Sequence, residues 1–487
     1  MMQIKTQHRI AKFILLLGNM LILFTIWLMI NYDNVTIDQL LYQLKSSASG
    51  VDHSLGISAF LTIGVLGILN TILEIKIYRF LTYRHAPRWL KIYFNAHSIM
   101  VAMTVMIVAL TSFGIKMQVV TYAKTIVNDS DFIEDHYVDP NNVELKFPAK
   151  KRNLIYIYLE SMESTYADTE LPMIEANYIQ ELSDLANDNL NFSNNEAFGG
   201  MLSFVGTTWT AASMVSQTSG VNIKVPLFKD SYNDQDYMPR IVNLGDILEK
   251  AGYNQTILMG SDAGFANRDT YFRTHGNYKI VDLNSLKEEG RLAKDYRVWW
   301  GFEDAKLFEY AKEEILELAA KEEAFNFTML TADTHFPDGY LCEDCLEEYD
   351  NQYANVIRCS SRRVKEFIDW LKTQAFYDNT TIIITGDHLT MDANFFKDID
   401  KNYVRTVYNC IINAEIKATK EKERLFGTFD MFPTTLAALN VEIEGNRLGL
   451  GTNLFASEKT LAEIYGYQNL NDYLNLRSDF YFEKFFK

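Results

Sequence analysis

The chain has 487 residues, 48% of them hydrophobic, with 46 Lys/Arg against 63 Asp/Glu and a formal net charge of −17 at pH 7. This length exceeds one ordinary domain, and the apolar content is sufficient for a large core. Residues 1–120 hold ten Lys/Arg and four Asp/Glu, net +6, so the remaining residues are net −23. Such an acidic region lacks the basic face that nucleic-acid binding requires, which excludes nucleic acid as a partner. An anionic substrate remains possible where a metal ion supplies positive charge.

Three apolar runs in the first 120 residues predict membrane-spanning helices near residues 13–30, 55–73 and 96–117. About 20 mainly apolar helical residues cross the hydrocarbon core of a bilayer, and the first two runs fit this length well. A cleaved signal peptide is an alternative for the first run, but its apolar stretch is longer than such peptides use. Buried core helices are the other alternative, and three such runs in succession argue against it.

Basic residues orient these predicted spans. The loop between the second and third spans contains Lys76, Arg79, Arg84, Arg88 and Lys91, whereas the loop between the first and second contains only Lys45. Because basic loops stay in the cytoplasm, the N-terminus is predicted to be cytoplasmic and everything after about residue 120 extracellular. The sequence thus predicts a multi-pass protein of a bacterial cell membrane.

The part of the chain after the spans divides into a polar linker or surface arm, residues 121–150, and a domain formed by residues 151–487. Short apolar runs at Asn153–Leu159, Ala324–Leu330 and Thr380–Thr385 are typical of buried strands. Amphipathic stretches at Asp304–Ala320 and Arg362–Thr373 predict helices. Strands that alternate with helices predict an α/β domain with a mostly parallel sheet and helices on both faces.

The four cysteines are Cys342, Cys345, Cys359 and Cys410. One CxxC pair is a weak zinc signal, because a structural zinc site needs four ligands. In an oxidising compartment Cys342 and Cys345 could form a local disulfide, and free thiols in a loop are the alternative.

Polar residues follow each predicted strand. Glu160 ends the first, His335 follows the second, and Asp387-His388 follows the third. Ligands of parallel sheets bind beyond the carboxyl ends of the strands, so these side chains are expected at one edge. Carboxylate oxygens and imidazole nitrogens suit a divalent ion such as Mn²⁺, Mg²⁺ or Zn²⁺. Taken singly, each residue could equally be a loop or helix-cap residue.

The segment Gly206–Gly220 is rich in hydroxyl groups and small residues and begins as a turn. A threonine at the start of a helix is usually only an N-cap. The same position also suits a nucleophile, since the helix dipole and the free N–H groups stabilise an alkoxide and a bound phosphate. A nearby metal ion lowers the pKa of the hydroxyl further.

Five motifs in this order resemble the alkaline phosphatase/sulfatase superfamily, in its branch of membrane phosphoglycerol transferases and lipoteichoic-acid-synthase-like enzymes. They are NLIYIYLES, GTTWTAASMVSQTSG, TADTHFPDGY, IIITGDH and FDMFPTTLAAL, and the resemblance covers most of residues 150–455. The family's nucleophile precedes a glycine by ten residues, as Thr210 precedes Gly220, which favours Thr210 over Thr207 and Thr208. NRLGLGTNLF, residues 446–455, is also similar to this branch.

The resemblance implies a role for each of six residues. Glu160, Thr210, Asp387 and His388 would hold one divalent metal, with Mn²⁺ preferred over Mg²⁺ or Zn²⁺. His335 would contact the phosphate or protonate the leaving oxygen. Arg268, in GFANRDTYF, would grip the headgroup phosphate, with a surface salt bridge as the alternative role.

The implied reaction moves glycerol phosphate from phosphatidylglycerol, through a threonine-linked intermediate, to a cell-surface glycan or glycerol-phosphate polymer. A phosphoethanolamine transferase, a phosphodiesterase or phosphatase, and an inactive membrane receptor are the alternatives. Two departures from the family matter. Thr210 is followed by Ala211 and Ala212 rather than by the C/S-x-P-S-R box of true sulfatases, which argues against sulfate ester hydrolysis. Lipoteichoic acid synthases usually have five spans, and three are predicted here.

Overall fold

Six short apolar runs pair into one sheet in the computed structural model, which describes residues 2–33, 35–47, 53–83, 88–225, 232 and 237–487. The strand order is β4-β3-β5-β2-β6-β7, and every neighbouring pair is parallel except β6 and β7. The strands are β2 Asn153–Leu159, β3 Asn254–Met259, β4 Lys279–Val281, β5 Phe325–Leu330, β6 Thr380–Gly386 and β7 Asn409–Ile412. The three predicted strands are therefore confirmed as β2, β5 and β6.

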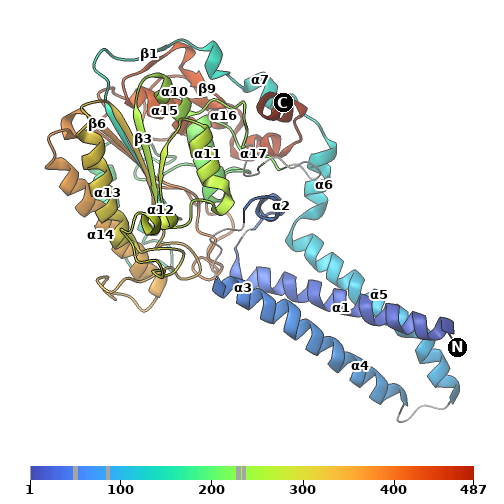
Figure 1. Ribbon diagram of the computed structural model, residues 1–487. Helices are drawn as coiled ribbons and strands as arrows, with labels where there is room; N and C mark the ends of the chain where they lie inside the picture. Colours follow the sequence, from blue (N-terminus) through green and yellow to red (C-terminus); the bar gives the residue numbers. More distant parts are fainter. Residues whose placement is uncertain (1, 34, 48–52, 84–87, 226–231, 233–236) are drawn as a thin grey trace. The chain divides into compact units, whose positions relative to one another are not determined.

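Each face of the sheet is covered by its own hydrophobic core. Successive side chains of β2 alternate between the faces, with Tyr156 in one core and Ile155 and Ile157 in the other. All seven residues of β2 are buried, as expected for a strand covered on both sides. The predicted α/β architecture with a mostly parallel sheet is thus confirmed, with α13 and α14 on one face and α10 and α15 on the other (Figure 1).

Helices cover both faces of the sheet. One face carries α8 Gln180–Asp188, α13 Asp304–Ala319 and α14 Gln352–Lys372. The other carries α9 Thr210–Ser219, α10 Leu244–Lys250, α11 Arg268–Thr274 and α15 Met431–Ala438. The helix predicted over Asp304–Ala320 is confirmed as α13, whereas the one predicted to begin at Arg362 begins ten residues earlier. The shorter elements are α12 Leu283–Glu288, α16 Leu461–Tyr465, α17 Tyr467–Asn475, α18 Asp479–Phe486, β8 Glu442–Ile443, β9 Arg447–Leu448 and β10 Gly451–Thr452.

The chain forms two units, of which the first comprises residues 1–37 and 51–124. Its helices are α1 Met2–Asn31, α3 His53–Ala59, the π-helix Phe60–Leu66, α4 Gly67–Tyr83 and α5 Arg88–Lys116. Three helical stretches of the described residues are long and apolar enough to cross a membrane, Arg9–Asn31, Leu55–Phe80 and Ser98–Lys116, and they overlap the three predicted runs. A polar contact joins α1 to α4, in which Asn19 Nδ2 donates to Thr71 Oγ1 at 2.9 Å.

The second unit comprises residues 38–50 and 125–487. The stretch predicted as a linker or surface arm contains α7 Phe132–His136 and β1 Leu145–Lys146, and both pack on the C-terminal part of the domain. β1 pairs with β8, and the ring of Phe132 stacks on Tyr473 with the ring centroids 4.9 Å apart. The remaining helices are α6 Val119–Val127, at the join between the two units, and α2 Ile37–Lys45.

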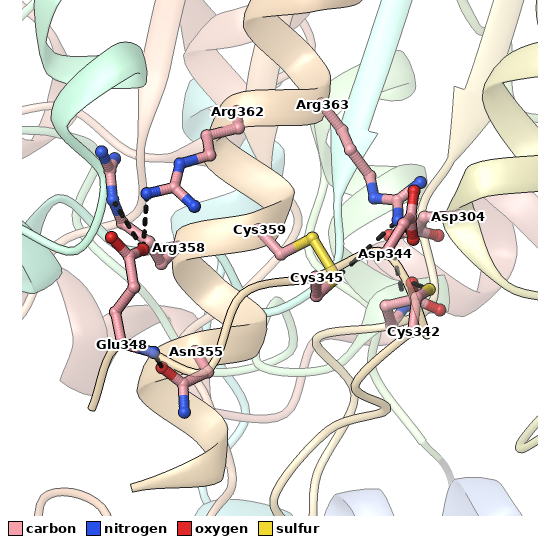
Figure 2. The surroundings of a disulfide bond; sticks show 11 residues. Asp304, Cys342, Asp344, Cys345, Glu348, Asn355, Arg358, Cys359, Arg362 and Arg363 are labelled. Atoms are coloured by element: carbon pink, nitrogen blue, oxygen red, sulfur yellow. Dashed lines mark hydrogen bonds and ion pairs between the residues drawn. A yellow bond between two sulfur atoms is a disulfide. The ribbon is translucent and has the colours of Figure 1, made fainter. Parts of the chain in front are cut away.

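The disulfide links Cys345 to Cys359, so the local CxxC disulfide does not form, and the alternative of free thiols holds for Cys342 but not for Cys345. Figure 2 shows that the bond ties the loop before α14 to the helix itself. Cys342 is a buried free thiol whose Sγ donates to Asp333 Oδ2 at 3.0 Å, and Cys410 is also free and buried. The earlier start of α14 explains the pairing, because it places Cys359 on a helix facing the loop.

Loss of this disulfide is expected to destabilise the second unit. The bond joins residues 14 positions apart, and a loop of about 15 residues gains roughly 3 kcal/mol from closure. The double variant Cys345→Ser, Cys359→Ser should therefore lower the free energy of unfolding by about 3 kcal/mol. Urea unfolding of the detergent-solubilised chain, followed by tryptophan fluorescence, measures this change.

Reductant provides the matched control for that experiment. Dithiothreitol should destabilise the wild-type chain and leave the double variant unaffected. Thiol labelling of the denatured, unreduced wild type should find two free cysteines, Cys342 and Cys410. Four reactive thiols would contradict the disulfide.

Candidate active site

The register of the sheet brings three predicted metal ligands together. Leu159 pairs with Gly386, so Glu160 and Asp387 leave adjacent strands at the same edge. His388 Nε2 lies 3.5 Å from Glu160 Oε1 and 3.4 Å from Asp387 Oδ2. All three side chains are buried, and one potential ligand atom from each lies within 4.8 Å of the others.

The hydrogen bonds of this cluster suit a cation. His388 Nδ1 contacts the carbonyl oxygen of Leu389 at 2.8 Å, and because a carbonyl can only accept, Nδ1 carries the hydrogen. The lone pair of Nε2 therefore faces the two carboxylates, as in a metal-ligating histidine. Asp387 Oδ1 accepts from the backbone N–H of Ser161, but Oδ2 accepts no hydrogen bond from the described part of the chain. A divalent ion among these atoms would satisfy that oxygen and offset the repulsion between the carboxylates of Glu160 and Asp387.

The pKa shifts have the same origin. Burial raises the pKa of Asp387 to about 7, and the negative charge of Glu160 adds to the rise. Burial acts to lower the pKa of His388, but the charges of Asp387 and Glu160 outweigh it, so this pKa lies above its ordinary value. Perturbed titration of this kind is typical of functional sites.

Thr210 lies at the first position of α9, beside the cluster. Its Oγ1 is 3.3 Å from Glu160 Oε2 and 3.3 Å from His388 Nε2. Trp209, at the N-cap, has no side-chain bond to the first turn, and a helix start leaves backbone N–H groups without intrahelical acceptors. The Thr210 hydroxyl and the N-terminus of α9, where the helix dipole is positive, therefore lie together beside the cluster.

The length of α9 explains the ten-residue spacing between Thr210 and the following glycine. Gly220 adopts φ 71° and ψ 21°, the left-handed conformation that commonly ends a helix. A Cβ at this position would lie 2.9 Å from the carbonyl oxygen of Leu448, so a larger residue would clash.

Gln217 fixes α9 to the sheet and was not among the predicted residues. Its Oε1 accepts from the hydroxyls of Tyr156 at 2.7 Å and Thr385 at 2.9 Å, and its Nε2 donates to the carbonyl oxygen of Gly386 at 3.2 Å. These bonds hold α9, which begins at Thr210, to β6, the strand that Asp387 follows. A glutamine in the middle of an otherwise apolar and hydroxyl-rich helix was the available signal.

His335 lies on the loop after β5, close enough that the charges of His388, Asp387 and Arg268 act on its ring. The loop is held by Asp304, whose Oδ1 accepts from the N–H of Ala332 at 2.8 Å. His335 Nδ1 must donate to the carbonyl oxygen of Phe336, 2.7 Å away, which leaves Nε2 with a lone pair. Desolvation by the surrounding protein lowers the pKa of His335 to about 4, so the ring is neutral at physiological pH.

Arg268 is the first residue of α11 and is only 5% exposed. Its Nη2 donates to Ser261 Oγ at 3.0 Å and to the carbonyl oxygen of Asp262 at 2.7 Å. Burial lowers its pKa, while the charges of Glu160 and Asp262 act to raise it. A surface salt bridge, the alternative considered for this residue, does not fit a buried side chain held by a neutral hydroxyl and a carbonyl.

Known proteins show the same organisation. The sulfatase family profile matches residues 152–441. The chain is 29% identical over 346 residues to "Phosphoglycerol transferase I" of Escherichia coli O6:K15:H31 (strain 536 / UPEC), covering 69% of this chain and 43% of that protein. It is 27% identical over 447 residues to the protein of that name from Salmonella choleraesuis (strain SC-B67), covering 88% and 54%. The chain thus spans about half the length of these relatives.

Solved structures share the fold. The lipoteichoic acid synthase LtaP from Listeria monocytogenes superposes with a TM-score of 0.51 at 18% identity, covering 67% of this chain and 82% of that one. The integral membrane protein lipooligosaccharide phosphoethanolamine transferase A (EptA) from Neisseria meningitidis gives 0.51 at 15% identity, covering 88% and 83%. With more than half of its residues matched by the family profile and the sheet in this arrangement, the chain belongs to the sulfatase family.

Proposed function

We propose that this protein is a membrane-anchored, metal-dependent phosphoglycerol transferase that acts outside the cell. The donor is phosphatidylglycerol, and the acceptor is a hydroxyl of a surface glycan or glycerol-phosphate polymer. The observation that carries the proposal is the position of Thr210 Oγ1, 3.3 Å from both Glu160 Oε2 and His388 Nε2 at the start of a helix. The relatives' name, phosphoglycerol transferase I, supports this choice of headgroup.

Glu160, Thr210, Asp387 and His388 would hold one divalent ion, for which Mn²⁺ is the proposed metal. Two carboxylates, one imidazole and one hydroxyl form a mixed oxygen and nitrogen set that accepts Mn²⁺, Mg²⁺ or Zn²⁺. When bound, the ion supplies positive charge that lowers the pKa of the Thr210 hydroxyl and stabilises charge on the phosphoryl oxygens. This local charge also explains how a region of net charge −23 can bind an anionic lipid headgroup.

In the first half-reaction, Thr210 Oγ1 attacks the phosphorus of the donor lipid. A bond forms between Oγ1 and phosphorus, and the bond between phosphorus and the diacylglycerol oxygen breaks. The N-terminal amides of α9 and the guanidinium of Arg268 stabilise the phosphoryl oxygens. Glu160 Oε2, at 3.3 Å, accepts the hydrogen of the Thr210 hydroxyl.

His335 handles the proton of the leaving group. Because Nδ1 donates to the carbonyl oxygen of Phe336, only Nε2 can exchange a proton with substrate. An anionic phosphodiester beside the ring raises the pKa of His335 from its low value, and the charged ring then donates from Nε2 to the diacylglycerol oxygen. In the second half-reaction the neutral ring accepts the proton of the acceptor hydroxyl at the same atom, and a bond forms between the acceptor oxygen and phosphorus. The bond between Thr210 Oγ1 and phosphorus breaks, and Glu160 returns its proton to Oγ1.

Donor profiling tests this assignment. The full chain in lipid vesicles with Mn²⁺ is given phosphatidylglycerol or phosphatidylethanolamine, each labelled in the headgroup, and its intact mass is measured. We expect one glycerophosphate adduct per chain, and one diacylglycerol released, from phosphatidylglycerol alone. An adduct from phosphatidylethanolamine only would make the protein a phosphoethanolamine transferase. Release of free glycerol phosphate at the same rate with and without acceptor would make it a phosphodiesterase.

A further inference from the structure

A short helix from between the first two candidate membrane spans is folded into the catalytic unit. α2 and the residues that follow it belong to the second unit, although the spans on either side in the sequence belong to the first. Gln39 and Tyr42 are buried, Tyr42 to 1% exposure, whereas Leu44 is 73% exposed. One side of this helix is therefore buried against the second unit. The predicted linker begins at residue 121, nearly 80 residues later in the sequence.

The buried side of α2 contacts the segment that carries Thr210. Gln39 Nε2 lies 3.3 Å from the carbonyl oxygen of Thr208, to which it donates, and 3.2 Å from the sulfur of Met391. The ring of Tyr42 packs on Trp209 with the centroids 5.3 Å apart. Trp209 is the N-cap of α9, and Met391 is three residues after His388. Gln39 thus bridges the nucleophile's loop and the loop of a proposed metal ligand.

The same helix contacts the segment that carries Arg268. The Tyr42 hydroxyl donates to the carbonyl oxygen of Ala266 at 2.8 Å and lies 2.7 Å from the Tyr237 hydroxyl. The N–H of Ser47 donates to Asn267 Oδ1 at 2.8 Å. Figure 1 shows α2, in dark blue, beside α11, which Arg268 begins.

The backbone before Arg268 needs such support. Ala266 has φ 58° and Asn267 has φ 57°, so two consecutive non-glycine residues adopt the left-handed conformation. A non-glycine residue in this conformation is strained and persists where surrounding contacts determine it. The bonds from Tyr42 and Ser47 to these two residues are contacts of that kind. They fix the direction in which the chain enters α11 and therefore the position of the arginine.

We propose that α2 is a positioning element of the active site. Its residues Gln39 and Tyr42 fix the positions of the nucleophile Thr210 and the headgroup-binding Arg268 relative to each other. Neither residue touches the proposed ligands Glu160, Asp387 or His388 in the described contacts, so both act through the backbones of Thr208 and Ala266. The inference rests on the proposed function for the identity of the reacting group. It adds a segment that a soluble domain beginning at residue 121 would lack.

The test compares Gln39→Met and Tyr42→Phe with wild type and with Gln43→Ala in the full, detergent-solubilised chain. Gln39→Met keeps the length of the side chain but removes the N–H donor, and Tyr42→Phe keeps the ring but removes the hydroxyl. Gln43 is the control, a glutamine one helical turn further along α2 whose side chain makes no hydrogen bond within the described residues. The probe is bis(p-nitrophenyl) phosphate with Mn²⁺, a soluble diester whose attack by Thr210 releases one p-nitrophenolate per active molecule.

A pre-steady-state burst separates positioning from folding. Its amplitude counts active molecules, and its rate constant reports the geometry of the site. We expect both variants to keep full amplitude and Mn²⁺ affinity while the rate constant falls about 10- to 100-fold, as small displacements of reacting groups cause. Gln43→Ala should match wild type.

Three outcomes would overturn the proposal. An unchanged rate constant in both variants would show that α2 is dispensable for positioning. A reduced amplitude at an unchanged rate constant would show a purely structural role. A wild-type burst with the diester but no adduct with phosphatidylglycerol would refute the proposed donor and leave the role of α2 measurable. Release of p-nitrophenolate by a Thr210→Ala variant at the wild-type rate would refute Thr210 as nucleophile and the role of α2 with it.

Discussion

Replacement of Thr210 by alanine is expected to abolish the covalent glycerophosphate adduct and to lower transfer activity by several orders of magnitude. Knocking out the nucleophile of a covalent enzyme costs on the order of 10⁶-fold in kcat, because binding and charge stabilisation alone remain. Thr210 is suited to that role because its Oγ1 is the hydroxyl 3.3 Å from both Glu160 Oε2 and His388 Nε2. Intact-mass spectrometry after incubation with phosphatidylglycerol and Mn²⁺ measures the adduct, and peptide mapping locates it.

Two further variants make the result specific. Thr210→Ser keeps the hydroxyl on the same helix position and should still form the adduct, at a reduced rate. Thr208→Ala removes a neighbouring hydroxyl that has no hydrogen-bond partner among the described residues, and it should still form the adduct. Thr207 is an unsuitable nucleophile because its hydroxyl already donates to the carbonyl oxygen of Phe204 at 2.8 Å. An adduct that persists in Thr210→Ala, or that disappears in Thr208→Ala, would refute the assignment.

The sheet and the clustering of its polar edge could be predicted from the sequence because both depend on local patterns. Asn153–Leu159 is a continuous apolar run that ends at a carboxylate, and Thr380–Thr385 ends at Gly386-Asp387-His388. Parallel strands place their carboxyl ends at one edge, so the residues that follow these two runs, Glu160 and Asp387, are expected at the same edge. The pairing of Leu159 with Gly386 is the register that achieves this.

The contacts that support the site could not be predicted because their partners are distant in the sequence. Gln39 and Thr208 are 169 residues apart, and Tyr42 and Ala266 are 224 apart. α2 has only nine residues, and although Ile, Leu and Tyr make up more than half of them, so short an amphipathic stretch does not identify the surface it packs on. That surface is formed by Thr208, Trp209 and Ala266, which come from distant parts of the second unit.

The disulfide between Cys345 and Cys359 was not predicted, for a related reason. Cys342 and Cys345 are neighbours in the sequence, but the start of α14 determines which cysteine faces which. The stretch before Arg362 is rich in Asn and Ser, which obscured the helical pattern of buried residues such as Tyr353 and Ile357. Asn351 caps the helix by accepting from the N–H of Ala354 at 3.1 Å, so α14 begins before Cys359.

Replacement of Asp387 by asparagine is expected to remove metal binding and, with it, adduct formation. The substitution takes away one of two buried carboxylates and leaves the shape of the side chain unchanged. Loss of outer-sphere partners alone typically weakens metal affinity 10- to 100-fold, so loss of a direct ligand should weaken it by more than about 100-fold. Isothermal titration of the metal-free, full-length chain with Mn²⁺ measures the affinity directly.

Stability gives a second readout that does not depend on catalysis. A ligand that binds only the folded state at 100 times its dissociation constant stabilises that state by about 2.7 kcal/mol. Mn²⁺ at that level should raise the thermal midpoint of wild type, whereas Asp387→Asn should show no rise at the same concentration. Without metal, the variant should be at least as stable as wild type, because it no longer buries two carboxylates beside each other.

Asp369→Asn is the matched control, since Asp369 is an exposed carboxylate of α14 paired with Lys365 and Lys372. It should bind Mn²⁺ and respond thermally as wild type does. If Asp387→Asn keeps wild-type affinity, the ion is held elsewhere and the cluster of Glu160, Asp387 and His388 has another role. If wild type itself gains no stability from Mn²⁺, Mg²⁺ or Zn²⁺, the proposed metal dependence is refuted, because the ion is needed to activate the Thr210 hydroxyl.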